Sequence, residues 1–254
     1  MAAELEKLAN ELAEQGHSVG AQLVKDSSKS WLKAGLIPKK LENNVLSRQK
    51  EPQTAELSLD EEWQRQTSRY MELGYHVELN LTEEAYLTSL PKFEPQPQEY
   101  QGKFDTPLLV ETRILWKKQA ELSGIVISDY LLSRMNETGE WDGNSSKTPT
   151  VPYTGYFNSW GQRFTHEISP FDAREKLAKD ECGASLHEGI AMQVAHPEFT
   201  QGKKYFHLIG SQVESGEVVC LDGWYGRPRL RAVWSGSAYD RFRPLVRGSK
   251  IVAG

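Results

Sequence analysis

The sequence predicts an α+β fold in which a mostly antiparallel sheet, ending in a C-terminal β-meander, packs against several capped helices. Helix-capping signals stand at Ser58, Ser169 and Ser185, and alternating apolar runs follow Gly202. The composition, with 38% hydrophobic and 26% charged residues, is ordinary for a globular protein and supplies enough apolar surface for a core.

The N-terminal part of the chain has a different pattern. Leucines recur at helical spacing between Leu5 and Leu12, and the polar, lysine-rich stretch from Pro38 to Thr54 is typical of a linker. We therefore expect a helical N-terminal extension and linker over residues 1–54. A single α+β domain should follow over residues 55–254.

The first well-specified helix of that domain should run from Leu59 to Leu73. Ser58 and Glu61 form a capping box at its start, and Gly74 is placed for a left-handed C-terminal cap. A shorter helix should begin after Thr82.

The middle of the chain alternates between extended and polar stretches. Residues 92–107 carry several prolines and should form an extended connector, and residues 108–116 have the pattern of a strand. The polar segment 136–152 should form a loop.

Aromatic residues then cluster within a short stretch: Tyr153, Tyr156, Phe157, Trp160 and Phe164. Two interpretations are open. The rings can form the wall of a ligand pocket, or they can supply bulk to a core strand.

Two helices are predicted next. Ser169 opens a helix that should extend to near Cys182, with Gly183 as its C-terminal cap. Ser185 opens the second, where Glu188 completes a capping box.

The meander should comprise strands at 205–213, 217–221 and 227–234. The first turn is expected at 214–216, and a wider turn is expected at 222–226.

Arginine occupies every second position of the last strand, at Arg227, Arg229 and Arg231. A strand places such residues on one face, where three guanidinium groups repel each other unless an anion neutralises their charge. The anion can belong to a ligand or to the protein itself. The candidate binding residues are Arg227, Arg229, Arg231, Trp224, Tyr156 and Trp160.

Charge is unevenly distributed although the net charge is only −5. Residues 51–105 contain twelve acids and four bases, whereas residues 221–254 contain seven bases and two acids. The net charge makes nucleic acid an unlikely partner, and the basic segment favours an anionic small molecule or protein partner.

The sequence lacks the common catalytic fingerprints. There is no G-x-S-x-G elbow, no P-loop and no G-x-G-x-x-G turn, and the histidines match no metal-binding spacing. We expect no cofactor and no metal, and no catalytic residue is identified. Without a secretory signal or a long apolar run, we expect a cytoplasmic protein that does not enter a membrane.

Several short segments resemble an uncharacterised bacterial family of about two hundred residues that has no assigned activity. The resemblance covers about residues 57–248 and rests on Gly74-Tyr75, 81–84, 184–191, 196–198, 208–211 and 227–230 before Trp234. It implies an intracellular domain and no cofactor or catalytic residue.

The best interpretation is a non-catalytic binding protein that presents its arginine strand and aromatic cluster to an anionic ligand or protein partner. The alternative is a small-molecule enzyme in which His166, His187 or His207 meets Asp or Glu in the folded chain.

Overall fold

The computed structural model describes residues 57–135, 148–164, 167–213 and 216–254. The predicted N-terminal extension, most of the predicted loop at 136–152, part of the 214–216 turn and His166 lie outside these residues. The strands are β1 (Thr106–Val110), β2 (Val126–Ile127), β3 (Tyr153–Phe157), β4 (Glu181–Gly183), β5 (Tyr205–Gln212), β6 (Glu217–Trp224), β7 (Arg227–Trp234) and β8 (Phe242–Ala253). The helices are α4 (Leu59–Glu72), α5 (Tyr75–Glu78), α6 (Glu83–Thr88), the 3-10 helix η2 (Gln98–Tyr100), α7 (Trp116–Leu122), α8 (Asp129–Arg134), α9 (Pro170–Glu175), α10 (Leu186–Ala195) and α11 (Glu198–Gln201).

The strands form one mixed sheet in the order β1-β3-β8-β5-β6-β7-β2, with β4 paired beside β8. The predicted α+β class is confirmed, but the prediction of a mostly antiparallel sheet is wrong, because β8 runs parallel to β5 and β2 runs parallel to β7. The parallel pairing with β5 arises because the long C-terminal strand β8 lies between β3 and β5. Pro244, Gly248 and three bases interrupt the apolar pattern of β8, so the sequence did not predict this strand.

The C-terminal meander is confirmed, since β5, β6 and β7 pair antiparallel in sequence order. The wide turn expected at 222–226 is a two-residue turn instead. Strand β6 continues to Trp224, which faces Arg227, and Tyr225 and Gly226 between them both have positive φ angles of 47° and 77°. Positive φ at both central residues is the mark of a type I′ hairpin, whose twist matches that of the strands.

Two predicted helix starts are confirmed in full. Ser58 with Glu61 and Ser185 with Glu188 both form complete capping boxes at the starts of α4 and α10. Gly74 has a φ of 79°, as a residue just past the end of α4 requires.

Other predicted boundaries are wrong. The helix after Ser169 ends at Glu175, and Cys182 and Gly183 belong to β4. A Cβ atom on Gly183 would lie only 2.7 Å from the Gly210 nitrogen, so this glycine permits close approach to β5 and caps no helix. The strand expected at 108–116 ends at Val110, and Trp116 begins α7.

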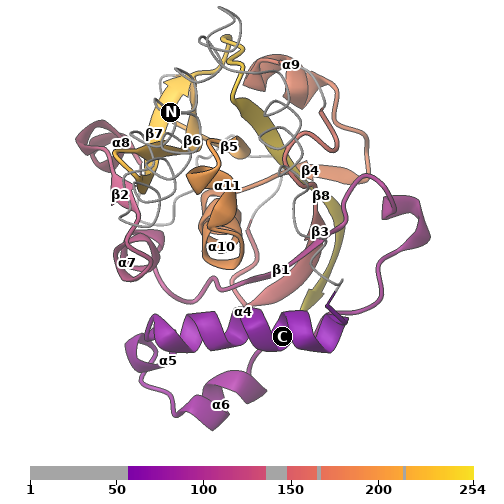
Figure 1. Ribbon diagram of the computed structural model, residues 1–254, viewed down its shortest axis with the longest axis vertical. Coiled ribbons are helices and arrows are strands. Elements are labelled where there is room, and N and C mark those ends of the chain that lie inside the picture. The colour runs from indigo at the N-terminus through magenta and orange to yellow at the C-terminus, as the bar shows by residue number, and fades with distance from the viewer. Residues whose placement is uncertain (1–56, 136–147, 165–166, 214–215) are drawn as a thin grey trace, which may run out of the picture. The chain divides into compact units, whose positions relative to one another are not determined.

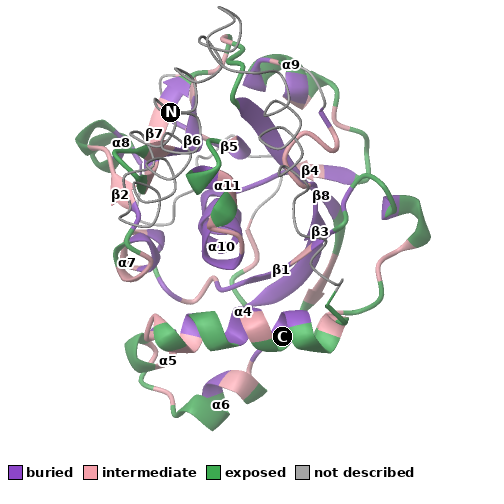
Figure 2. Ribbon diagram, viewed as in Figure 1, coloured by how far each residue is buried: buried purple, intermediate pink, exposed green. Residues whose placement is uncertain are grey.

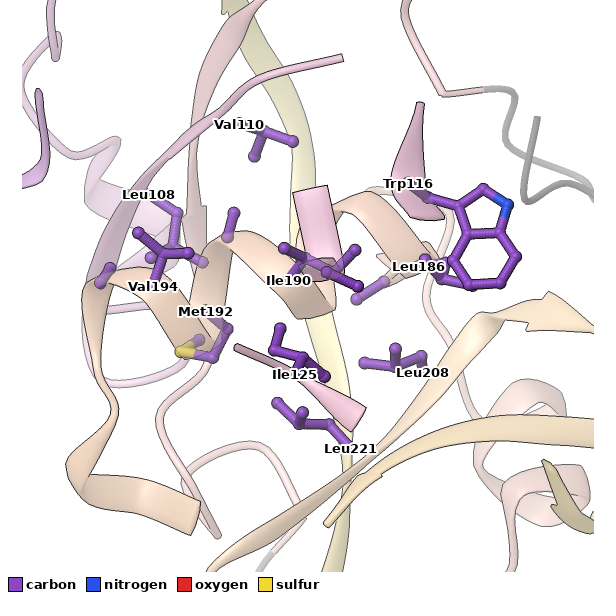
Figure 3. Close-up of a cluster of buried hydrophobic side chains, with 14 of the residues drawn as sticks. Leu108, Val110, Trp116, Ile125, Leu186, Ile190, Met192, Val194, Leu208 and Leu221 are labelled. Carbon is purple, nitrogen blue, oxygen red and sulfur yellow. The ribbon is translucent and has the colours of Figure 1, made fainter. Parts of the chain in front are cut away.

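Helix α10 lies at the centre of the fold, with strands of the sheet on more than one side of it (Figure 1). All of its residues are buried, whereas α4 keeps an exposed outer side (Figure 2). Its apolar side chains pack in one cluster with Leu108, Leu208 and Leu221 of the sheet (Figure 3). The central helix therefore organises the main core. Among the described residues, no helix is long and apolar enough to cross a membrane.

The meander has two different faces because successive strand residues point to opposite sides. Phe206, Leu208, Leu221 and Leu230 pack in the same cluster as α10. Val218, Cys220, Val233 and Phe242 belong to a second apolar cluster on the other side. We call this second side the arginine face, because it also carries Arg229 and Arg231.

Candidate functional site

Strand register builds the arginine face row by row. His207 of β5 faces Cys220 of β6, and Cys220 faces Arg231 of β7. In the next row, Asp222 of β6 faces Arg229 of β7. Neighbouring residues in register share a face of the sheet, so these five side chains belong to one surface.

Asp222 holds two of the arginines together. Its carboxylate, of which 4% is exposed, accepts two hydrogen bonds of 2.9 Å from the Nε and Nη2 of Arg229. The same carboxylate accepts a 2.6 Å bond from the Nε of Arg231. The anion next to these arginines is therefore a residue of the meander itself.

One positive charge remains in surplus at this point, because two guanidinium groups share one carboxylate. Arg231 donates only through Nε to a described residue, and a third of its side chain is exposed. Its two Nη groups are thus available to an acceptor from outside the protein. Arg227, at the exposed end of the same strand, adds a further cation opposite Trp224.

His207 lies fully buried beneath this surface. Its ring stacks on Phe242 with the centroids 4.8 Å apart and an interplanar angle of 16°. Burial, together with the nearby charges of Arg231 and Arg243, lowers the pKa of His207 to about 3. The imidazole is therefore neutral at pH 7, with one donor and one acceptor nitrogen, and neither nitrogen has a hydrogen-bond partner in the described part of the chain.

Cys220 lies between His207 and Arg231 but does not supply a nucleophile. Burial raises the pKa of its thiol to about 12. A thiol in that state is protonated at neutral pH, and only the thiolate is nucleophilic. Cys220 is a free, buried cysteine.

Aromatic side chains surround the arginines. The Trp224 ring is 48% exposed and lies 5.2 Å from the guanidinium carbon of Arg229. Tyr225, at the tip of the hairpin, is 89% exposed. The Tyr239 ring is 40% exposed and lies 6.2 Å from the His207 ring. These rings offer apolar contact area next to fixed positive charge.

The structure does not bring Tyr156 and Trp160 into this group. Strands β8, β5 and β6 separate β3, which carries Tyr156, from the arginine strand. Every residue of β3 is buried, and the Tyr156 hydroxyl donates to the Glu94 carbonyl at 2.7 Å. Trp160 is half-buried and donates through Nε1 to the Tyr205 carbonyl at 3.1 Å. For Tyr156, the structure favours the core-strand interpretation of the aromatic cluster.

Sequence reasoning missed Asp222 and Tyr239 as members of this site. Asp222 was assigned to a turn, although its alternation with Cys220 and Trp224 is a strand signal that could have placed it on the arginine face. Tyr239 follows β7 without any local pattern that points toward His207.

A second polar cluster lies on the α10 side of the sheet. Glu188 accepts bonds of 2.5 Å from both the Tyr153 hydroxyl and the Nε of Arg247. All three side chains are buried. Because these groups satisfy one another and sit away from solvent, we interpret the cluster as structural.

The histidines provide little support for an enzyme. The groups that shift the pKa of His207 are arginines and not carboxylates, and His187 is buried in α10. Within the described ranges, no group of three His, Cys, Asp or Glu residues could hold a metal ion.

Comparison with known proteins leaves the site to be interpreted from its own geometry. No family model, no curated protein and no solved structure matches the chain. The resemblance to an uncharacterised bacterial family therefore stays a prediction.

Proposed function

We propose that the protein is a non-catalytic binding protein that takes an anionic ligand on the arginine face of the meander. The proposal rests on the excess of positive charge at Asp222, where one buried carboxylate forms ion pairs with both Arg229 and Arg231. The Nη groups of Arg231 are left to donate to an external acceptor. A guanidinium is a strong partner for such an acceptor because its charge is permanent and its donors are planar.

Two further features support this function. Asp222 fixes the Nε sides of both arginines, so little side-chain freedom is lost when a ligand binds. The half-exposed Trp224 ring beside Arg229 offers a surface for an apolar part of the ligand. The cytoplasmic location and the enzyme alternative stay predictions.

Calorimetric titration with inorganic phosphate and with sulfate, at constant ionic strength, tests the proposal. We expect saturable binding of both anions by the wild-type protein. Arg231→Gln should weaken it by about 10- to 100-fold, the value of one charge-assisted contact.

Arg69→Gln is the matched control, because Arg69 lies on α4 and pairs there with Glu72. This variant should bind both anions like the wild type. Absence of saturable binding in the wild type, or equal weakening in both variants, would contradict the proposed function.

A further inference from the structure

We propose that His207, Arg231 and Tyr239 form a subsite for a compact tetrahedral oxyanion, such as the phosphate group of a small phosphorylated molecule. This inference rests on the proposed function and specifies the ligand group that the arginine face takes.

The buried imidazole of His207 destabilises the free protein. Its side chain is fully buried in an apolar cluster, and both ring nitrogens are without a described partner. A buried polar group without a hydrogen bond destabilises a protein, and a phenylalanine would pack on Phe242 without that cost. An imidazole at this position is explained by a partner that the described part of the chain does not provide.

Contrast with the Glu188 cluster strengthens this argument. There, the Tyr153 hydroxyl, the Nε of Arg247 and the Glu188 carboxylate all have partners at hydrogen-bonding distance. Arg174 likewise directs its donors to the carbonyls of Ile209 and Ser211 and to the Gln212 side chain. Some other buried side chains, such as Tyr86 and Ser211, have one polar atom without a described partner, but among the described residues only His207 has two.

Positive charges act on the His207 ring. Arg231 of β7 shares its face of the sheet, and Arg243 of β8, in register with Phe206, acts from the α10 side. Arg243 bonds backbone carbonyls and leaves its buried Nε unpaired. This region therefore has a surplus of positive charge, which favours an anion.

Three different groups supply the hydrogen-bond donors of the subsite. A neutral imidazole supplies one N–H, Arg231 supplies its Nη groups, and Tyr239 supplies a hydroxyl. The donors come from three different segments, β5, β7 and the segment between β7 and β8, so they are not confined to the plane of one guanidinium group. A tetrahedral oxyanion can accept from several directions, whereas a planar carboxylate is best matched by a single guanidinium fork.

His207→Phe tests the subsite through two readouts, the melting temperature of the free protein and its affinity for sulfate. We expect the melting temperature to rise by about 2–6 °C, because two unsatisfied nitrogens are removed. We expect the affinity for sulfate to fall by about tenfold or more, because a donor is lost. A residue that serves only the fold would show the opposite sign in the first readout.

Three further measurements keep the test decisive. Tyr239→Phe should weaken sulfate binding severalfold, whereas Tyr225→Phe, which removes an exposed hydroxyl at the hairpin tip, should not. His207→Gln keeps one donor and one acceptor and should bind sulfate more tightly than His207→Phe. The wild-type protein should bind sulfate and phosphate at least about tenfold more tightly than acetate.

The outcomes separate this inference from the proposed function. If Arg231→Gln weakens sulfate binding while His207→Phe and Tyr239→Phe leave it unchanged, the subsite is wrong and the arginine face still binds anions. A lowered melting temperature in His207→Phe with unchanged affinity would also overturn the subsite. If the wild-type protein binds none of the anions, both proposals fail.

Discussion

Glu188 combines two interactions in one side chain. It completes the capping box of α10, and its carboxylate accepts from Arg247 and Tyr153 in the core. A buried charge that loses its partner destabilises a protein far more than a surface charge does. The side chain therefore ties the start of the central helix to β8 and β3.

Replacing Glu188 by glutamine tests this role. An amide keeps the capping interaction but removes the charge that answers Arg247, so we expect the free energy of unfolding to fall by roughly 3–5 kcal/mol. Urea denaturation measures the change. Glu61→Gln makes the same change in the exposed capping box of α4 and should cost less than about 1 kcal/mol. If the free energy of unfolding falls by similar amounts in the two variants, the ion pair between Arg247 and Glu188 contributes little to stability.

His207 should make stability depend on pH in mildly acidic solution. Its pKa is about 3 in the folded protein against an ordinary value of 6.5, so between these values the unfolded chain binds a proton that the folded protein does not. Stability therefore falls as the pH decreases from 6.5 toward 3. From pH 6.5 to pH 5 the loss from this residue should be about 1.5 kcal/mol.

Urea denaturation of the wild type and of His207→Phe at both pH values checks this prediction. The variant should lose less stability than the wild type by that amount. Carboxylates with lowered pKa values, such as Glu62 and Glu181, lose their contribution only below about pH 4.5 and do not affect this interval. Equal losses in the two proteins would mean that the buried imidazole already has a partner in the free protein.

At the scale of elements, α4 protects the open edge of the sheet at β1. The Gln66 amide donates to the Pro107 carbonyl and accepts from the Leu109 nitrogen, both at 2.8 Å, much as a neighbouring strand would. The Tyr70 hydroxyl also donates to the Leu109 carbonyl at 2.7 Å. A covered edge cannot pair with another chain, which removes a route to aggregation.

Gln66→Leu should show how much this edge contact contributes to the free energy of unfolding. The substitution leaves two backbone groups of β1 without partners, and we expect the free energy of unfolding to fall by about 2–4 kcal/mol. Gln64→Leu, on the exposed side of the same helix, is the control and should change stability by less than about 0.5 kcal/mol. If both variants unfold at the same urea concentration, the edge contact contributes nothing measurable.

Local signals predicted the elements that local chemistry determines. The capping boxes at Ser58 and Ser185 and the alternation in β5 to β7 depend on residues a few positions apart, so they are visible in the sequence. The segment from Lys176 to Gly183 was misassigned as helix. Strand β4 forms because it pairs with β8 and because Gly183 and Gly210 allow close approach to β5. These partners are distant in sequence, so local patterns did not indicate the strand.

At the scale of the whole molecule, long-range pairing decides both the sheet and the site. Strand β8 pairs with β3, β4 and β5, and this insertion makes the sheet mixed. The alternating arginines of β7 indicated a basic face. Only the register with β6 shows that Asp222 lies next to two of these arginines and forms ion pairs with them. The strand order separates Tyr156 from the arginines of β7, and the register brings His207 toward Arg231.

The most direct test of the account follows the imidazole signals of His207 by nuclear magnetic resonance while sulfate is added. We predict a saturable shift of the His207 ring nitrogens in the wild-type protein, strongly reduced in Arg231→Gln and retained in Arg69→Gln. If the His207 signals stay unchanged while those of other residues respond to sulfate, the anion binds elsewhere and the proposed site is wrong.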